Sequence, residues 1–320
     1  EPFMEPFSGV LSNLKLRTSW GRAGTDNIGQ FQYMSAYGTG GDAVFGGQNP
    51  EIAPGYTETR FPNPNITWET SEMFNIGIDA SFFNGKLNLE ADWFYKKTND
   101  ILRERTDMPA ILGYKLPAAN VGKVDNRGID LNITHRNHLR DFNYSIAGNL
   151  TWARNKVIDL LEPAGEKNNP RQRSTGHSMS QYFGYEALGL FQSDEEANNW
   201  PQPQFGKAKA GDIKYKDQNG DGIIDAEDEI AIGRSNYPEL VYGLNLNAEW
   251  KGFDITFFFQ GAALADFYYN GYLAFPYIEG RGGALLEHHI GNTWTPENPK
   301  AEFPRLYYGG NANNQLFSSF

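Results

Sequence analysis

Acidic and amide side chains alternate around a glycine in residues 217–228. This spacing matches the calcium loop of twelve residues, in which oxygen ligands at positions 1, 3, 5, 7, 9 and 12 surround the ion and a glycine at position 6 makes the sharp turn. Gly222 stands at position 6 here, and an aspartate replaces the glutamate that an EF-hand has at the last position. The spacing therefore predicts a calcium site whose ligands are the side chains, or for isoleucine the carbonyl oxygen, of Asp217, Asn219, Asp221, Ile223, Asp225 and Asp228.

The surroundings of this loop favour a structural role for the ion. No helical pattern of the usual length flanks residues 217–228, so the loop is similar to the calcium loop of dockerins and unlike a paired EF-hand sensor. The alternative is an acidic turn rich in Asn, Gly and Asp that binds no metal. We expect residues 211–234 to form a calcium-loop-like insertion whose ion orders the chain and performs no chemistry.

A second group of candidate residues is aromatic. These residues follow the last clear strand pattern, and they are Tyr268, Tyr269, Tyr272, Phe275 and Tyr277. On a loop, such rings stack on sugars or pack against a partner protein, whereas in a strand they belong to the aromatic girdle of a membrane barrel. The sequence leaves these alternatives open, so the rings are candidates for contact with a substrate or a partner.

No other motif points to catalysis. The segment Glu287-His288-His289 is too short for a zinc signature, and the sequence has neither a nucleophile elbow nor a phosphate loop. The absence of cysteine excludes disulfides and thiolate chemistry. A net charge of -11 argues against nucleic acid as a partner, because a phosphate backbone needs a basic face. We therefore expect a protein that is not an enzyme.

Strands with a period of two must position these candidate residues. The clearest strand places Phe74, Ile76 and Ile78 on one face and polar residues on the other. Similar segments of about ten residues recur along the chain, as they do in membrane barrels and in half-buried soluble sheets. In a barrel, the residues expected to face lipid are Phe74, Ile76, Ile78, Leu89, Trp93, Leu131, Ile146, Leu246 and Phe257. Those expected to face the lumen are Asn75, Asp79, Glu90, Asp92, Asp130 and Asn245.

The connections between these segments alternate between short and long. Asn84-Gly85 and Lys251-Gly252 predict hairpin turns of two residues, and residues 137–141 make a third short connection. The long excursions cover residues 22–71, 97–121 and 155–239. Outer-membrane barrels combine short periplasmic turns with long extracellular loops. The alternation therefore predicts an all-β fold that is part of a large antiparallel transmembrane β-barrel with long extracellular loops.

This arrangement also makes predictions about the loops and the aromatic residues. Residues 155–239 should form one extracellular excursion, and any strands inside it, such as residues 182–192, should occur in an even number. Phe82 and Trp250 lie beside short turns, whereas Trp93 and Trp152 lie about ten residues further along their strands, roughly one membrane crossing. We interpret these residues as two aromatic girdles of a membrane barrel. The alternative is that they are core residues of a soluble sheet.

Several short motifs occur in a fixed order along nearly the whole chain. They are Asn63-Pro64-Asn65-Ile66-Thr67-Trp68-Glu69, Gly122-Lys123-Val124-Asp125-Asn126-Arg127-Gly128, Gly211-Asp212-Ile213, Tyr242-Gly243-Leu244-Asn245, Lys251-Gly252-Phe253-Asp254, Trp294-Thr295-Pro296-Glu297-Asn298-Pro299 and Phe303-Pro304-Arg305-Leu306. Together with the calcium-like loop they resemble the SusC/RagA branch of the TonB-dependent outer-membrane receptors.

This resemblance implies a location in the cell outer membrane and a barrel of about 22 strands that surrounds an N-terminal plug. About seven strands are expected here, roughly a third of such a barrel. The resemblance also implies import of oligosaccharides or peptides, a SusD-like surface lipoprotein as a lid, and energy from the TonB complex acting through an N-terminal part outside this sequence. We interpret residues 1–320 as a barrel fragment without the plug, the TonB box and the final strands.

A soluble secreted protein is the alternative to the transporter. It would be a calcium-stabilised all-β carbohydrate-binding module or a glycoside hydrolase. The exposure of the apolar strand residues separates the two hypotheses, because a soluble sheet buries them and a section of a barrel wall leaves them exposed.

Overall fold

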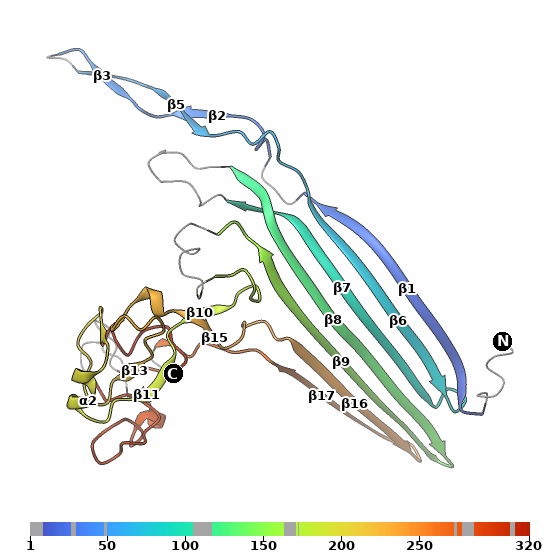
Figure 1. The fold of residues 1–320 in the computed structure, drawn as a ribbon. Helices are drawn as coiled ribbons and strands as arrows, with labels where there is room; N and C mark the ends of the chain where they lie inside the picture. The colour runs from blue at the N-terminus through green and yellow to red at the C-terminus, as the bar shows by residue number, and fades with distance from the viewer. Residues whose placement is uncertain are drawn as a thin grey trace. The chain divides into compact units, whose positions relative to one another are not determined.

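The structure is a computed structural model that describes residues 9–26, 30–47, 50–104, 117–162, 171, 173–271, 274–276, 285–307 and 311–320. The chain divides into two compact units (Figure 1). Unit 1 consists of residues 1–164, 174–179 and 238–264, and unit 2 consists of residues 165–173, 180–237 and 265–320. The predicted insertion, residues 211–234, is one part of unit 2.

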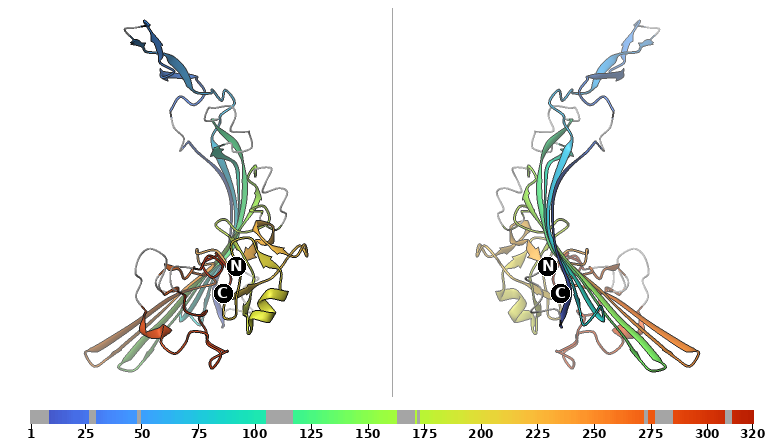
Figure 2. Two further views of the ribbon diagram at one scale, coloured as in Figure 1. Left: turned by 90° about the vertical axis from the view of Figure 1, so that its left-hand side faces the viewer. Right: turned by 90° about the vertical axis from the view of Figure 1, so that its right-hand side faces the viewer.

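Unit 1 is built around a seven-stranded antiparallel sheet whose strands lie side by side in Figure 1 and overlap over much of their length in the turned views of Figure 2. In spatial order the strands are β1 (Leu11–Thr25), β6 (Glu69–Phe82), β7 (Leu87–Glu104), β8 (Ala118–Leu139), β9 (Phe142–Asp159), β16 (Leu240–Trp250) and β17 (Phe253–Ala263). This confirms the predicted all-β antiparallel fold. Because β9 pairs directly with β16, the chain between them forms one excursion from the sheet.

Two of the three tight turns contain two residues each. The β16–β17 turn is Lys251-Gly252, as predicted, and both residues have positive φ angles, 48° and 86°. The β8–β9 turn is Arg140-Asp141, because strand pairing continues to Leu139 and Phe142. The predicted connection over residues 137–141 was therefore too long.

The β6–β7 turn differs from its prediction. Pairing ends at Phe82 and Leu87, so the turn comprises the four residues 83–86. Phe83, Asn84 and Gly85 all have positive φ angles. The Asn84-Gly85 signal thus marks the turn correctly, but the prediction of a two-residue hairpin was wrong.

Three strands continue beyond the points where the sequence predicts long excursions. β1, β7 and β9 end at Thr25, Glu104 and Asp159, whereas the excursions were expected from residues 22, 97 and 155. The additional residues are mostly polar on both faces, so they carry no alternating apolar signal. Their backbone pairing holds them in the sheet, as between Lys97 and Asp125.

The β1–β6 connection contains two small sheets of two strands each. β2 (Ala36–Thr39) pairs with β5 (Tyr56–Arg60), and β3 (Ala43–Phe45) pairs with β4 (Glu51–Ala53). All four strands lie within one connection, so they add no strand to the seven-stranded sheet.

Unit 2 contains short elements. They are β10 (Tyr182–Gly184), β11 (Ala187–Leu190), α2 (Asp194–Asn199), β12 (Gln202–Pro203), β13 (Ile213–Tyr215), β14 (Ile223–Ile224), the 3-10 helix η3 (Ala226–Asp228), β15 (Ile230–Ile232) and the 3-10 helix η5 (Glu287–His289). β10 pairs with β15, β11 with β13, and β12 with β14. Among its described residues, the excursion thus holds an even number of strands, as predicted. The single strand expected over residues 182–192 is instead two strands in different small sheets.

Two clusters of buried apolar side chains form the core of unit 2. One contains Tyr185, Ile213, Tyr215 and Ile224. The other contains Phe191, Ala197 and Ala208, with Trp200 packed against it. Burial of these groups is the main driving force for folding a segment with so little regular structure.

Helix α2 is held by polar contacts at both ends of its first turn. The Ser193 hydroxyl accepts a hydrogen bond from the Glu196 amide, and a Glu196 carboxylate oxygen accepts one from the Gln192 amide. The other Glu196 oxygen lies 2.7 Å from Lys214 Nζ, which is 3.8 Å from the centroid of the Trp200 ring. These contacts hold the pKa of Glu196 below its usual value, chiefly through the Lys214 hydrogen bond.

Helices are few and short in the part of the chain that the structure describes. None of them is long and apolar enough to cross a membrane.

Candidate functional site

One face of the seven-stranded sheet is apolar and exposed. Cross-strand pairing joins Ile76, Trp93 and Ile129 in a continuous row across three strands. Their exposed fractions are 43%, 42% and 44%, although residues of this kind are normally buried in a soluble sheet. The register also places Leu246 between Ile146 and Phe257, as the alternation predicts. This face has the composition of a lipid-facing wall, and its exposure argues against the soluble alternative.

Aromatic rings gather at two levels of the apolar face. Next to the tight turns, Phe142 pairs with Trp250, and Phe253 continues the row. At the other level, the Trp93 ring lies 6.3 Å from that of Phe74 and 6.4 Å from that of Tyr95. Phe142 and Trp152 are ten residues apart on β9, a separation of about 33 Å at 3.3 Å per residue along a tilted strand. The two predicted girdles are therefore present at a spacing that fits the hydrocarbon core.

The opposite face of the sheet carries an ionic network. Arg17 on β1 donates to both carboxylate oxygens of Asp79 on β6, at 2.7–2.9 Å. It also donates to both oxygens of Asp92 on β7, at 2.7 and 2.9 Å. Lys15 lies 3.9 Å from Asp79. Two of the predicted lumen residues are thus joined by a cation that the sequence did not reveal as their partner.

Amide side chains line the same polar face. A groove of about 300 Å³ is bordered by Asn88, Glu90, Asn132, Asn149, Asn245 and Phe258. The side-chain oxygen of Asn245 is buried there without a hydrogen-bond partner. Such a surface can donate and accept hydrogen bonds with a polar solute or with another part of the receptor.

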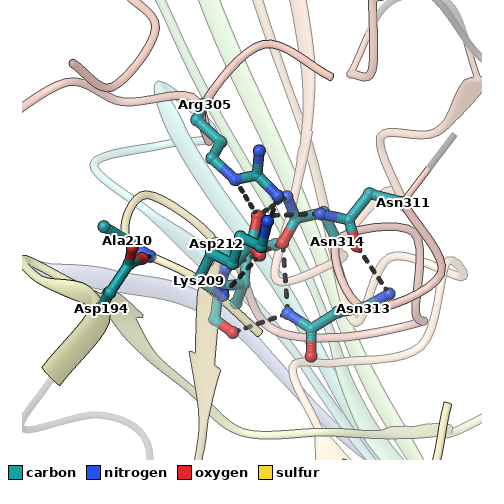
Figure 3. A network of polar contacts seen from close by, with 9 residues as sticks. Asp194, Lys209, Ala210, Asp212, Arg305, Asn311, Asn313 and Asn314 are labelled. Atoms are coloured by element: carbon teal, nitrogen blue, oxygen red, sulfur yellow. Dashed lines mark hydrogen bonds and ion pairs between the residues drawn. The ribbon is translucent and has the colours of Figure 1, made fainter. Parts of the chain in front are cut away.

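Unit 2 contains a buried, hydrogen-bonded carboxylate, that of Asp212 (Figure 3). Asp212 is fully buried and accepts hydrogen bonds from Arg305 Nε at 2.8 Å, from Asn311 Nδ2 at 2.8 Å and from Asn314 Nδ2 at 3.0 Å. The Lys209 amide donates to its second oxygen. A buried charge costs several kcal/mol unless it is paired and hydrogen-bonded, and these donors supply that compensation. The sequence places Asp212 and Arg305 in separate motifs, and only the fold shows that they are partners.

The predicted calcium loop has a hydrogen-bonded conformation. The two Asp217 oxygens accept from the amides of Gly220 and Gly222, and Asp221 accepts from the Ile223 amide. Asp228 is fully buried and accepts from the amides of Gln218 and Asp225. In the described part of the chain, no group of three or more His, Cys, Asp or Glu side chains could hold a metal ion. The carboxylates are thus close in sequence but directed at backbone amides, and the calcium site stays a prediction.

The predicted aromatic residues differ in their surroundings. The Tyr268 ring lies 4.1 Å from that of Phe317, and partial burial raises the pKa of its hydroxyl. Tyr269 is exposed, with its hydroxyl 3.5 Å from His288 Nε2. Phe275 borders a small cavity beside Arg305. Tyr272 and Tyr277 lie outside the described residues.

A second cavity is bordered by two of these rings and by further aromatic residues. It has a volume of about 220 Å³ and is bordered by Tyr182, Asp266, Phe267, Tyr268, Tyr269 and Phe317. The structure thus brings Tyr268 and Tyr269 to one cavity and places Phe275 at another.

The sheet has one apolar and one polar face, with tight turns at one end and long connections at the other. These features are characteristic of outer-membrane β-barrel proteins. Residues 8–226 match the model of the family described as TonB dependent receptor-like, beta-barrel. The chain belongs to this family and is part of an outer-membrane barrel.

Individual relatives support the same assignment. TonB-dependent receptor P26 of Formosa agariphila is 33% identical over 309 residues, which are 92% of this chain and 30% of that protein. TonB-dependent receptor SusC of Bacteroides thetaiotaomicron is 27% identical over 279 residues, which are 83% of this chain and 26% of that protein. The chain therefore spans less than a third of the length of these receptors.

The fold is also similar to that of a solved structure. The RagAB peptide transporter superposes with a TM-score of 0.73 at 23% identity, over 98% of this chain and 34% of that chain. The similarity extends over the residues of both units, so the fold of each unit has a counterpart in that solved structure.

Proposed function

We propose that the complete receptor imports an oligosaccharide or a peptide across the outer membrane, together with a SusD-like surface lipoprotein and with energy from the TonB complex. The observation that carries the proposal is the two-faced wall in a member of the TonB-dependent receptor family. Its exposed apolar face suits lipid, and its charged and amide face suits a wet lumen. Import, and not catalysis, is the activity that such a wall serves.

The turn lengths support a sidedness for this wall. Tight turns join β6 to β7, β8 to β9 and β16 to β17, and all three lie at the same end of the sheet. Short turns are periplasmic in outer-membrane barrels. Unit 2 is inserted after β9 and after β17, at the opposite end of those strands, so we assign it to the extracellular side.

The relatives support the proposed partner and substrate. One relative is named SusC, and the RagAB structure is that of a peptide transporter. By analogy, a surface lipoprotein would cover the extracellular side of this receptor, and a peptide or oligosaccharide would pass between them.

Within unit 2, the exposed aromatic rings are the proposed contact with that substrate or partner. Phe267 is 84% exposed and Tyr269 is 44% exposed, and both border the same cavity. Large exposed rings next to a cavity suit stacking on a sugar or packing against a protein. Tyr268 borders the same cavity and packs against the Phe317 ring.

We also propose that the acidic loop of unit 2 binds calcium as a structural ion. Asp217, Asn219, Asp221, Asp225 and Asp228 offer hard oxygens on the side where calcium is plentiful, and each carboxylate oxygen keeps a further lone pair beside its hydrogen bonds. Binding would draw these side chains together and order the segment around them.

Uptake measurements in cells test the import proposal. Cells that express the receptor should accumulate labelled oligosaccharides or peptides, and cells lacking it should not. Collapse of the proton gradient should stop uptake without lowering surface binding, because TonB delivers energy from that gradient. Uptake that survives loss of the gradient would contradict TonB-dependent import.

The aromatic contact has its own test. Tyr269→Ala should reduce uptake while the barrel assembles normally, and Tyr237→Ala is the matched control because Tyr237 is also an exposed tyrosine of unit 2. Equal uptake by both variants would remove Tyr269 from the proposed contact surface.

A further inference from the structure

Each of two neighbouring tight turns begins with a cationic residue in a left-handed backbone conformation, which other residue types adopt more readily. Arg140 begins the β8–β9 turn with a φ angle of 55°, and Lys251 begins the β16–β17 turn with a φ angle of 48°. Left-handed positions in two-residue hairpins favour Asn, Asp and Gly, and long side chains there carry a conformational cost. A residue kept in such a conformation is a reason to look for a function.

Strand pairing brings the two turns close together. Phe142 on β9 pairs with Trp250 on β16, so the turn before Phe142 and the turn after Trp250 are neighbours. Below the turns, Leu139, Phe142, Trp250 and Phe253 form one row on the apolar face. All four side chains are exposed, from 37% for Phe142 to 77% for Phe253.

The two cations are available to an outside ligand. Neither Arg140 nor Lys251 forms an ion pair in the part of the chain that the structure describes, and both are exposed. Lys251 Nζ lies 5.4 Å from the centroid of the Trp250 ring, so it is on the apolar side of the sheet. The nearby carboxylates of Glu249 and Asp254 face each other on the polar side.

We propose that Arg140 and Lys251 bind the headgroup phosphate of a phospholipid in the periplasmic leaflet of the outer membrane. The row of Leu139, Phe142, Trp250 and Phe253 contacts the glycerol backbone and the upper acyl chains. A guanidinium binds a phosphate through paired hydrogen bonds, and an ammonium adds a compact point charge. Aromatic residues lie at the same depth as headgroups in membrane barrels. The exposed apolar row beside Lys251 favours a lipid as the ligand, because a free phosphate ion would leave this row uncovered.

Native mass spectrometry of the complete receptor in detergent tests this site, with phosphatidylglycerol as the probe. Arg140→Gln and Lys251→Gln should each weaken lipid binding about fivefold, since one cation at an anionic membrane surface contributes about 1 kcal/mol. Phe253→Ala should also weaken it. Lys207→Gln is the control, because Lys207 is an exposed lysine of unit 2, outside this row. Heat-modifiable electrophoretic mobility confirms that each variant forms a barrel.

Three results would overturn the proposal. The first is lipid binding by the Arg140→Gln, Lys251→Gln double variant that equals that of the wild type. The second is complete displacement of the lipid by millimolar inorganic phosphate, and the third is no effect of Phe253→Ala, since either of these two would show a simple anion site. Energised uptake should be the same in all variants, so failure of this site is separable from failure of the import proposal.

Discussion

Arg17 reaches Asp92 across an intervening strand because the residue between them is a glycine. The register pairs Arg17 with Gly77 and Gly77 with Asp92, so the guanidinium passes over the place where a side chain would stand. A Cβ atom at Gly77 would lie 2.1 Å from Asp92 Oδ1 and 2.9 Å from Arg17 Cζ. The glycine therefore permits one cation to bridge the carboxylates of two neighbouring strands.

Gly77→Ala should displace Arg17 and separate it from Asp92. We expect a loss of about 1–3 kcal/mol in the free energy of unfolding, the usual cost of an inserted methyl group in a packed site. Urea unfolding of the folded receptor in lipid measures it. Gly21→Ala is the control, because a Cβ at Gly21 on β1 meets nothing within 4 Å. Similar losses in both variants would show that the effect belongs to glycine replacement in general.

Lysine scanning tests which face of the wall meets lipid. Ile133 and Asn132 are neighbours on β8 and point to opposite faces. Ile133→Lys should cost about 2–4 kcal/mol near the bilayer midplane, whereas Asn132→Lys should cost little because it enters the lumen. Assembly yield and urea stability in vesicles provide the comparison. Equal tolerance of lysine on the two faces would contradict the assignment of the faces.

Much of this wall could be predicted from the sequence, because lipid and water select side chains with a period of two. The alternation around Ile76 and the Lys251-Gly252 turn both reflect local rules. The strand ends were missed, because residues such as Lys97 and Thr98 are polar on both faces and only pairing with β8 shows that they belong to the sheet.

The partnerships within the sites could not be predicted, because they join distant parts of the chain. Arg17 and Asp92 are 75 positions apart, and Asp212 and Arg305 are 93 positions apart. Single charged residues carry no spacing signal, so their pairing follows only from the register of the sheet and from the packing of unit 2. The prediction of a two-residue β6–β7 turn was wrong for a different reason. Phe83 belongs to the turn in a left-handed conformation that its side chain does not favour.

Acid should weaken the contact between α2 and β13. The pKa of Glu196 is lower in the folded chain than in the unfolded chain, where it is about 4.3. The ionised carboxylate therefore stabilises the fold fully at pH values above the unfolded pKa. This stabilisation is lost as the pH falls through the lower pKa of the folded chain. Glu196 and Lys214 are partly exposed, so the contribution is about 0.5–1 kcal/mol. Hydrogen exchange of residues 191–215 between pH 3 and pH 6 should show this loss, and Glu196→Gln should abolish it. Glu195→Gln, on the exposed side of the same helix, should retain the wild-type profile.

Calcium should order the acidic loop of unit 2. In its absence, the Asp217 and Asp221 carboxylates are held by backbone amides, and mutual repulsion opposes any closer approach. An ion that takes six to eight oxygens would offset this repulsion and draw the side chains around Gly222. Limited proteolysis between residues 211 and 234 should therefore become slower with millimolar calcium, and Asp217→Ala or Asp221→Ala should remove the protection. Glu227→Gln is the control, because Glu227 lies in the same loop but not at a ligand position. Cleavage that chelation leaves unchanged in the wild-type receptor would show that the loop is an acidic turn without a metal, held together by the amide hydrogen bonds alone.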